Sequence, residues 1–139
     1  MRSTAFIILL FLSFSCTAKT KAAVTSNNLN GTWKPVKEDM GGIVLPNMAF
    51  ESQKLIINDS NYTFIAESTD KGIVRYSNDK MDIYGKDGVN TGKHYTAIYK
   101  YENGELTICY NLAGNSYPEA FATKGQPLFL LCVFKKQQP

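Results

Sequence analysis

The segment KHYTAIYKYENGELTICY, residues 93–110, contains two runs of alternating apolar and polar side chains joined by Asn103-Gly104. Asn-Gly favours the left-handed backbone of a tight two-residue turn, so the segment predicts a β-hairpin. Because such a turn fixes the pairing of the flanking strands, the register can be derived. Apolar side chains then meet on one face: Tyr101 with Leu106, Tyr99 with Ile108, and Ala97 with Tyr110. Lys100 and Thr107 fall on the opposite face.

Two further turns give the same result when their registers are derived in this way. A turn at Asp59-Ser60 aligns two apolar pairs: Ile57 with Tyr62, and Leu55 with Phe64. A turn at Asn78-Asp79 aligns Tyr76 with Met81 and Val74 with Ile83, and it opposes Arg75 to Asp82 on the other face. Three independent hairpins therefore each predict one apolar face and one polar face.

Short β-type runs separated by turn residues continue along the rest of the chain, and no long stretch has a convincing helical period. Eight strands are expected, at residues 31–38, 53–58, 61–66, 72–77, 80–85, 93–102, 105–110 and 128–135. Pro35 lies in the first strand and lacks an N–H donor, which predicts a sheet edge or a bulge there. Residues 40–50 contain two glycines and Pro46, so we expect a loop with one short helical turn.

The fold class follows from the exposed edges that such a meander would otherwise leave. Closing the sheet on itself removes both edges. We therefore expect an all-β, eight-stranded antiparallel up-and-down barrel that forms one monomeric domain at residues 31–136. With eight strands, side chains either just fill the interior or leave room for one small ligand.

The only Trp of the chain, Trp33, stands where a polar stretch gives way to the first expected strand. A side chain of that size at a strand start predicts that later strands close over it. Gly31, two residues earlier, leaves room for another part of the chain to come close.

The first thirty residues have the pattern of a delivery segment. Arg2 is followed by an apolar run at residues 5–14, which is too short to span a bilayer as a helix but suits a secretory signal. Ser15-Cys16 and the polar stretch after it resemble the cleavage box of bacterial lipoproteins. We therefore expect a signal peptide at 1–15, and lipid attachment at Cys16 with a tether at 16–30. In the alternative, cleavage after Ala18 removes Cys16 and the protein is secreted.

Charge and residue types limit the function classes. A net charge of +3 with scattered lysines provides no field suited to nucleic acid. His94 is the only His and the acidic residues are scattered, so we expect no metal site, no cofactor and no enzyme activity. The loop at 85–92 carries oxygen ligands but lacks the spacing of a calcium loop, and a flexible turn is expected there.

Several motifs resemble the lipocalin-like domains of bacterial secreted and lipid-anchored proteins. Residues 31–33 match the Gly-x-Trp opening of lipocalins, and residues 92–101 and 104–111 resemble the family's Gly-Ile-Tyr-Lys and Leu-Thr-Ile-Cys-Tyr signatures. Residues 118–121 stand where the family has Pro-Thr-Glu-Phe. The resemblance implies a lipocalin-type barrel that binds a small apolar molecule.

The chain departs from the family pattern at two places. Tyr117 stands where members of the family have Arg. Lipocalins often place an Arg against the Trp near the end of the domain, where this chain has Lys135 or Lys136. A Lys stem can cover an indole, but it lacks the planar stacking of a guanidinium group.

The predicted interior face is rich in Tyr, and each buried phenol needs a hydrogen-bond partner. Either a filled core sends the hydroxyl groups to the barrel mouth, or these groups line a partly wet ligand pocket. The sequence leaves both arrangements open. The candidates for ligand binding are Trp33, Tyr62, Tyr76, Tyr95, Tyr99 and Tyr110.

Cys109 and Cys132 fall on neighbouring strands at the end of the expected barrel. A register that places them opposite each other also pairs the residues beside them: Ile108 with Val133, and Tyr110 with Leu131. A cross-strand disulfide and two buried free thiols are both compatible with this register.

The loop at 111–126 is long for a hairpin connection. Such a loop usually packs on its own barrel. It is expected either to cap the mouth as a lid or to cover an outer patch formed by Leu128, Leu130 and Phe134.

These observations predict a cell-envelope protein, anchored to the membrane through Cys16, that binds a small apolar or amphipathic molecule inside the barrel. The alternative is an envelope module with a filled core that binds a protein or a glycan through its rim loops. A continuous cavity behind Tyr95 and Tyr99 separates the two.

Overall fold

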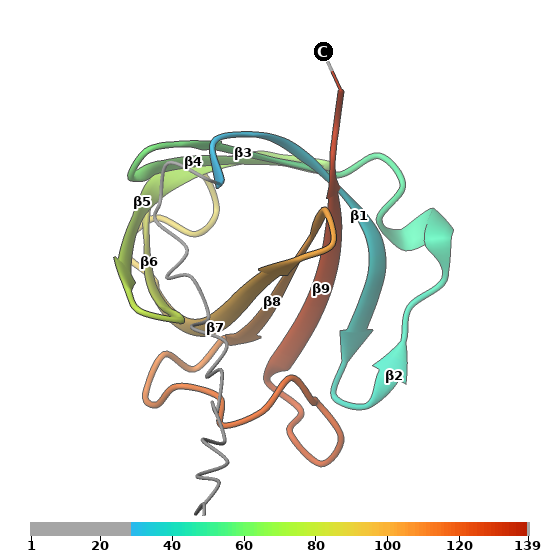
Figure 1. The fold of residues 1–139 in the computed structure, drawn as a ribbon. Helices are drawn as coiled ribbons and strands as arrows, with labels where there is room; N and C mark the ends of the chain where they lie inside the picture. Colours follow the sequence, from blue (N-terminus) through green and yellow to red (C-terminus); the bar gives the residue numbers. More distant parts are fainter. Residues whose placement is uncertain (1–28, 139) are drawn as a thin grey trace, which may run out of the picture.

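The computed structural model describes residues 29–138, and its strands form a closed antiparallel up-and-down barrel. Each of the eight barrel strands pairs with the next barrel strand along the chain, and β1 also pairs with β9, which closes the ring (Figure 1). The eight barrel strands are β1 (Gly31–Met40), β3 (Lys54–Asn58), β4 (Asn61–Ile65), β5 (Thr69–Ser77), β6 (Lys80–Asp87), β7 (His94–Glu102), β8 (Glu105–Asn111) and β9 (Phe129–Lys136). The predicted fold class is confirmed.

The three derived hairpin registers are confirmed pair by pair. Ile57 opposes Tyr62, Val74 opposes Ile83, and Tyr99 opposes Ile108. The first residue of each tight turn has a left-handed backbone: Asp59, Asn78 and Asn103 have φ between 53° and 55°. Asp and Asn tolerate this conformation better than other residues with a Cβ, which explains why the turn residues locate the hairpins.

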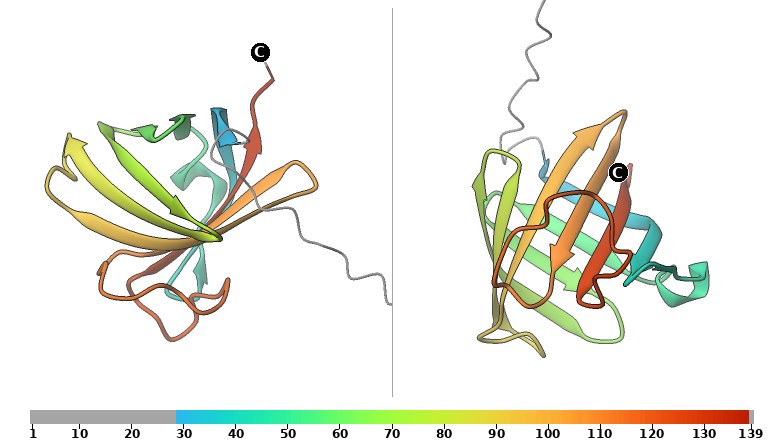
Figure 2. Two further views of the ribbon diagram at one scale, coloured as in Figure 1. Left: turned by 60° about the vertical axis from the view of Figure 1, so that its left-hand side comes forward. Right: turned by 90° about the horizontal axis from the view of Figure 1, so that it is seen from below.

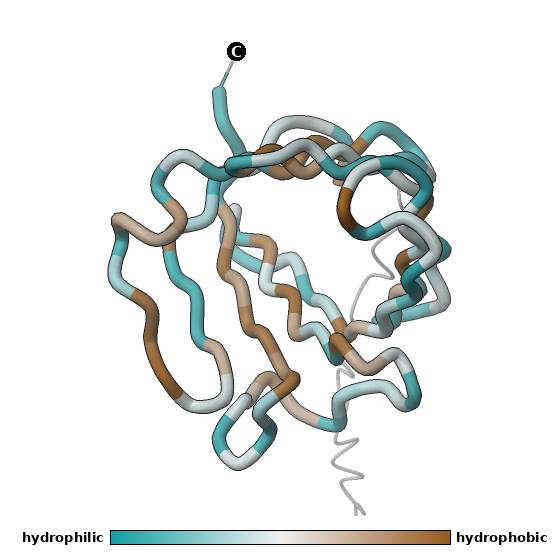
Figure 3. Tube along the Cα trace, turned by 180° about the vertical axis from the view of Figure 1, so that it is seen from behind, coloured by the Kyte–Doolittle hydropathy of each residue, from teal (hydrophilic) through white to brown (hydrophobic). Residues whose placement is uncertain are grey.

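The connection between β1 and β3 projects from the barrel. It contains the two-residue strand β2 (Ile43–Val44), which pairs with the end of β1, and the 3₁₀ turn η2 (Asn47–Ala49). The short helical turn was predicted, whereas β2 and the two additional residues at the end of β1 were not. In Figure 3, the brown stretch of β2 lies outside the ring of strands.

A bulge interrupts β1 at the predicted proline. The pairing of β1 with β9 shifts between Pro35 and Lys37, and both Val36 and Lys37 are exposed. Because Pro35 cannot donate to the ladder, the extra residue is accommodated beside it. The bulge reverses the alternation of the strand, so Glu38 faces the interior.

The two ends of the barrel differ, because each connection at one end has two residues and each at the other end has three or more. The closed end carries the turns at 59–60, 78–79 and 103–104. Trp33 is fully buried, and its Nε1 donates to the carbonyl of Leu29 at 2.8 Å. The open end carries the connections at 41–53, 66–68, 88–93 and 112–128.

The pairing of β8 with β9 corrects the predicted register by one residue. Cys109 opposes Leu131, and Ile108 opposes Cys132. The two cysteines therefore project to opposite faces of the sheet, and both are free and buried. The prediction failed because the connection at 112–128 is long, and a long loop does not fix a register as a two-residue turn does.

The same one-residue shift changes the role of the final strand. Leu130 lines the interior and Phe134 is buried in the core, so the predicted outer patch at Leu128, Leu130 and Phe134 does not exist. Of these three residues, only Leu128 is exposed.

The connection at 112–128 lies against the outer face of the barrel, where Figure 2 shows it crossing β7 and β8. Tyr117 donates its hydroxyl hydrogen to Oδ2 of Asp82 at 2.6 Å, and Thr96 donates to the carbonyl of Ser116 at 2.6 Å. Asp82 and Thr96 both face outward, so these contacts hold the loop on the wall. The lid interpretation is wrong for this segment, although Leu112 at its start reaches the interior.

Candidate functional site

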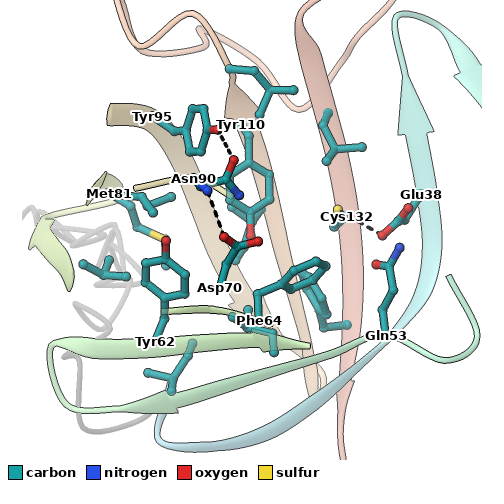
Figure 4. A pocket seen from close by; sticks show the side chains of 18 of the residues that line it. Glu38, Gln53, Tyr62, Phe64, Asp70, Met81, Asn90, Tyr95, Tyr110 and Cys132 are labelled. Carbon is teal, nitrogen blue, oxygen red and sulfur yellow. Dashed lines mark hydrogen bonds between the residues drawn. The ribbon is translucent and has the colours of Figure 1, made fainter. Parts of the chain in front are cut away.

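The interior of the barrel contains a cavity of about 250 Å³ toward the open end (Figure 4). The sequence left a filled and a hollow interior open, and the structure has a hollow one. Most of the wall is apolar: Leu55, Ile57, Phe64, Val74, Met81, Ile83, Ile108, Leu112, Leu130 and Phe134. Such a wall favours the apolar part of a ligand.

Four of the six predicted ligand-binding residues line this cavity: Tyr62, Tyr76, Tyr95 and Tyr110. Trp33 and Tyr99 do not. Trp33 is sealed at the closed end, and Tyr99 packs edge-on against Tyr76 with its hydroxyl donating to the carbonyl of Asn78 at 3.0 Å. These two inward-facing aromatic residues belong to the packed core and do not reach the cavity. The predicted lipid-attachment residue, Cys16, lies outside the described residues.

Glu38 lines the cavity. Regular alternation of side chains along β1, counted from the inward-facing Trp33, would instead place Glu38 on the outside of the barrel. The bulge at Pro35 turns it inward, and the side chain is 4% exposed. Sγ of Cys132 donates to Oε1 of Glu38 at 3.7 Å, a long contact from a weak donor. Burial raises the pKa of Glu38, and the Cys132 contact opposes that shift.

A second carboxyl group, Asp70, is held at the open end by the connection between β6 and β7. The backbone N–H of Asn90 donates to Oδ1 of Asp70 at 2.9 Å, and the hydroxyl of Tyr95 donates to Oδ1 of Asn90 at 2.8 Å. Burial, with a smaller contribution from the nearby Asp70 charge, raises the pKa of Tyr95. These hydrogen bonds hold the segment that the sequence predicted as a flexible turn.

The position of Asn90 depends on a close approach at Gly85. A Cβ on Gly85 would lie 1.8 Å from the carbonyl oxygen of Asn90, so no larger residue fits. Two glycines near a polar residue are a common turn pattern, and the sequence therefore gave no signal that Asn90 and Asp70 belong to the cavity wall.

Two buried polar atoms of the cavity wall have no hydrogen-bond partner within residues 29–138: Oε1 of Gln53 and the hydroxyl of Tyr76. Burial raises the pKa of Tyr76 to about 12, so the phenol keeps its proton at physiological pH. An unpaired buried polar atom costs free energy that a ligand or a water molecule can recover.

The cavity wall contains two carboxyl groups and no basic side chain. Glu38 and Asp70 are both buried, and none of the lining residues is Lys, Arg or His. Every lysine within residues 29–138 is instead exposed or half-buried. The wall can therefore accept hydrogen bonds and carry negative charge, but it cannot neutralise an anion.

Comparisons with protein-family models, with curated proteins and with solved structures found no match. Within residues 29–138, no three His, Cys, Asp or Glu side chains lie together as a metal site. No helix in that part of the chain is long and apolar enough to cross a membrane.

Proposed function

We propose that this protein binds a small apolar or amphipathic molecule inside the barrel, as a lipocalin-like protein. The cavity of about 250 Å³ with its largely apolar wall carries the proposal. A cavity of roughly 150 Å³ holds benzene, so this one suits a molecule of about ten non-hydrogen atoms.

The proposal is tested by calorimetric titration of 1-octanol into protein purified from cells that express all 139 residues. Octanol matches the cavity in size and has one polar group. We expect saturable binding at one site. Leu130→Trp should abolish it, because Leu130 lines the cavity and an indole would fill the space.

A matched control is Leu128→Trp, which adds the same indole at an exposed position two residues away. It should bind octanol as the unmodified protein does. Circular dichroism and thermal unfolding of both variants separate a blocked cavity from a damaged fold. Absence of octanol binding by the folded, unmodified protein would refute the proposal.

The proposal also places the protein at the cell envelope, attached through a lipid on Cys16, with secretion as the alternative. The apolar run at 5–14 followed by Ser15-Cys16 supports it. Intact mass of the purified protein is the test. Loss of residues 1–15 with added acyl mass supports the lipid anchor, whereas a chain that begins at Lys19 supports secretion.

One observation favours a second candidate, the binding of an envelope protein or a glycan through the rim. The connection after β1 exposes three apolar side chains in a short stretch: Ile43 (69%), Val44 (60%) and Met48 (80%). If this surface is functional, the double variant Ile43→Ser/Met48→Ser should lose specific cross-links in the envelope while its affinity for octanol stays unchanged. Unchanged cross-links would remove this candidate.

A further inference from the structure

The charged groups of the cavity wall are all acidic. Glu38 and Asp70 bring two buried carboxyl groups, Gln53 adds an unpartnered carbonyl oxygen, and the wall contains no cationic side chain. The wall thus offers carboxyl and amide oxygens with no cation to pair with them, although the unpartnered hydroxyl of Tyr76 remains a donor there. A ligand head that donates hydrogen bonds and carries positive charge complements this wall.

We propose that the cavity selects an amphiphile with a primary-amine head, bound as the ammonium ion, and an unbranched apolar tail of about eight carbons. The inference rests on the proposed function and adds the class of ligand. Its size limit follows from the cavity volume of about 250 Å³.

Glu38 is the carboxyl group that is available to such a head. Asp70 already accepts the N–H of Asn90 at 2.9 Å. The contact that Glu38 makes is the thiol of Cys132 at 3.7 Å, which is weak and easily replaced. An ammonium group beside Glu38 would form a charge-assisted hydrogen bond in place of that contact.

Gln53 supplies the second acceptor for the same head. Figure 4 shows Gln53 and Glu38 side by side on the wall, at the edge of the cavity away from Tyr95. Oε1 of Gln53 is buried and unpartnered, while its Nε2 donates to the carbonyl of Ala49 at 3.1 Å. An ammonium ion has three donors and no acceptor, so it can satisfy Glu38 and Gln53 together.

The same wall disfavours a carboxylate head. A carboxylate head placed beside Glu38 would bring two carboxyl groups together with no cation to pair with either. Burying an unpaired charge is costly. A neutral alcohol lies between the two cases, because its single donor can satisfy one acceptor. The head group should therefore set the order of affinity among ligands with the same tail.

The test compares three probes that share a tail length and differ in the head: octylamine, 1-octanol and octanoate. Each is titrated calorimetrically, below its micelle concentration and at about pH 8, into protein purified from cells that express all 139 residues. At that pH an amine with an ordinary pKa near 10.4 is protonated. We expect octylamine to bind tightest, then octanol, and octanoate weakest.

Glu38→Gln removes the charge while keeping the shape of the side chain. It should lower the affinity for octylamine about tenfold or more and improve the affinity for octanoate. The affinity for octanol should stay within about threefold of that of the unmodified protein. Gln53→Met removes the second acceptor and should also weaken the binding of octylamine. Glu102→Gln, an equal charge change on an exposed side chain, should leave all three affinities unchanged.

The outcomes separate the two proposals. If octanol binds but octanoate binds as tightly as octylamine, or Glu38→Gln leaves the order unchanged, the head-group inference is wrong and the ligand-binding function stands. If no probe binds to the folded protein, the proposed function itself fails. Circular dichroism of Glu38→Gln and Gln53→Met confirms that each variant retains the barrel before its affinities are compared.

Discussion

Nζ of Lys136 lies 5.5 Å from the centroid of the Trp33 indole ring. This contact brings the last strand over the side chain at the start of the first, and the N–H of Gln137 donates to the carbonyl of Thr32 at 2.7 Å beside it. The Lys stem can lie there because Gly31 has no side chain: a Cβ on Gly31 would stand 2.5 Å from Cε of Lys136. Gly31, Trp33 and Lys136 therefore form one unit that seals the closed end.

The first prediction is that Gly31→Ala destabilises the barrel by more than an ordinary glycine substitution. Gly31 has φ of +136°, where a Cβ is strained at a cost on the order of 1–3 kcal/mol, and the new methyl group must also displace Lys136. Chemical denaturation monitored by Trp33 fluorescence measures the loss.

Gly104→Ala is the control for this effect. Gly104 has φ of +78°, and a Cβ there would meet nothing within 4 Å, so its cost reports backbone strain without a clash. Removing the clash with Lys136→Ala should bring the cost of Gly31→Ala toward that of Gly104→Ala. Equal costs in both backgrounds would show that the Lys136 stem does not limit this site.

The barrel was predictable where tight turns link the strands. Asp59, Asn78 and Asn103 each fix a register, and every pair derived from these turns is present. The pairing of β8 with β9 was not predictable, because a long connection leaves the register free and the continuous apolar run at 129–134 is compatible with either face.

The polar half of the site was hidden for a related reason. Glu38 reaches the cavity through a bulge whose position Pro35 indicates, but a proline does not reveal which residues turn inward after it. Asp70 and Asn90 depend on a close loop approach at Gly85 that no periodicity reports. The tyrosines, by contrast, follow simple alternation, and four of the predicted candidates line the cavity.

The second prediction concerns pH. Burial raises the pKa of Glu38 above its ordinary value of 4.5, so the folded state prefers the protonated carboxyl group. The stability that this proton provides is complete below pH 4.5 and is lost as the pH rises through the raised pKa. Glu38→Gln, which is uncharged throughout, should therefore gain melting temperature relative to the unmodified protein as the pH rises from about 4.5 to 8.

The groups that face Glu38 do not reverse this sign. Gln53 is uncharged, and burial raises the pKa of both Cys132 and Tyr110, so these two stay protonated across the range. Glu102→Gln, on the exposed surface, is the comparison variant. A difference in melting temperature between Glu38→Gln and the unmodified protein that stays constant with pH would contradict the prediction.

The third prediction is that Cys109 and Cys132 remain reduced thiols and resist alkylation in the folded protein. They face opposite sides of the sheet, and burial raises the pKa of each, which lowers the fraction of reactive thiolate. Iodoacetamide labelling followed by peptide mapping should find both unmodified without denaturant and both modified in guanidinium chloride.

Lys135→Cys provides the positive control, because the Lys135 side chain is 62% exposed. A thiol at that position should be labelled completely in the folded protein. A peptide in which a disulfide links Cys109 to Cys132 would instead show that β9 pairs in the other register.

The fourth prediction uses the bulge in β1, where deleting a residue should do little harm. Val36 and Lys37 both point outward and together oppose the single residue Val133, so removing Val36 restores regular pairing with β9 and keeps Glu38 inside. Deletion of Val36 should cost less than about 1 kcal/mol of unfolding free energy and preserve octanol binding.

Deletion of Lys34 is the comparison, because Lys34 lies in a regularly paired part of β1. Its removal must either turn Trp33 outward or shift the pairing of Trp33 with Leu55, and it should abolish cooperative unfolding. Equal damage from the two deletions would mean that Val36 is an ordinary member of the strand.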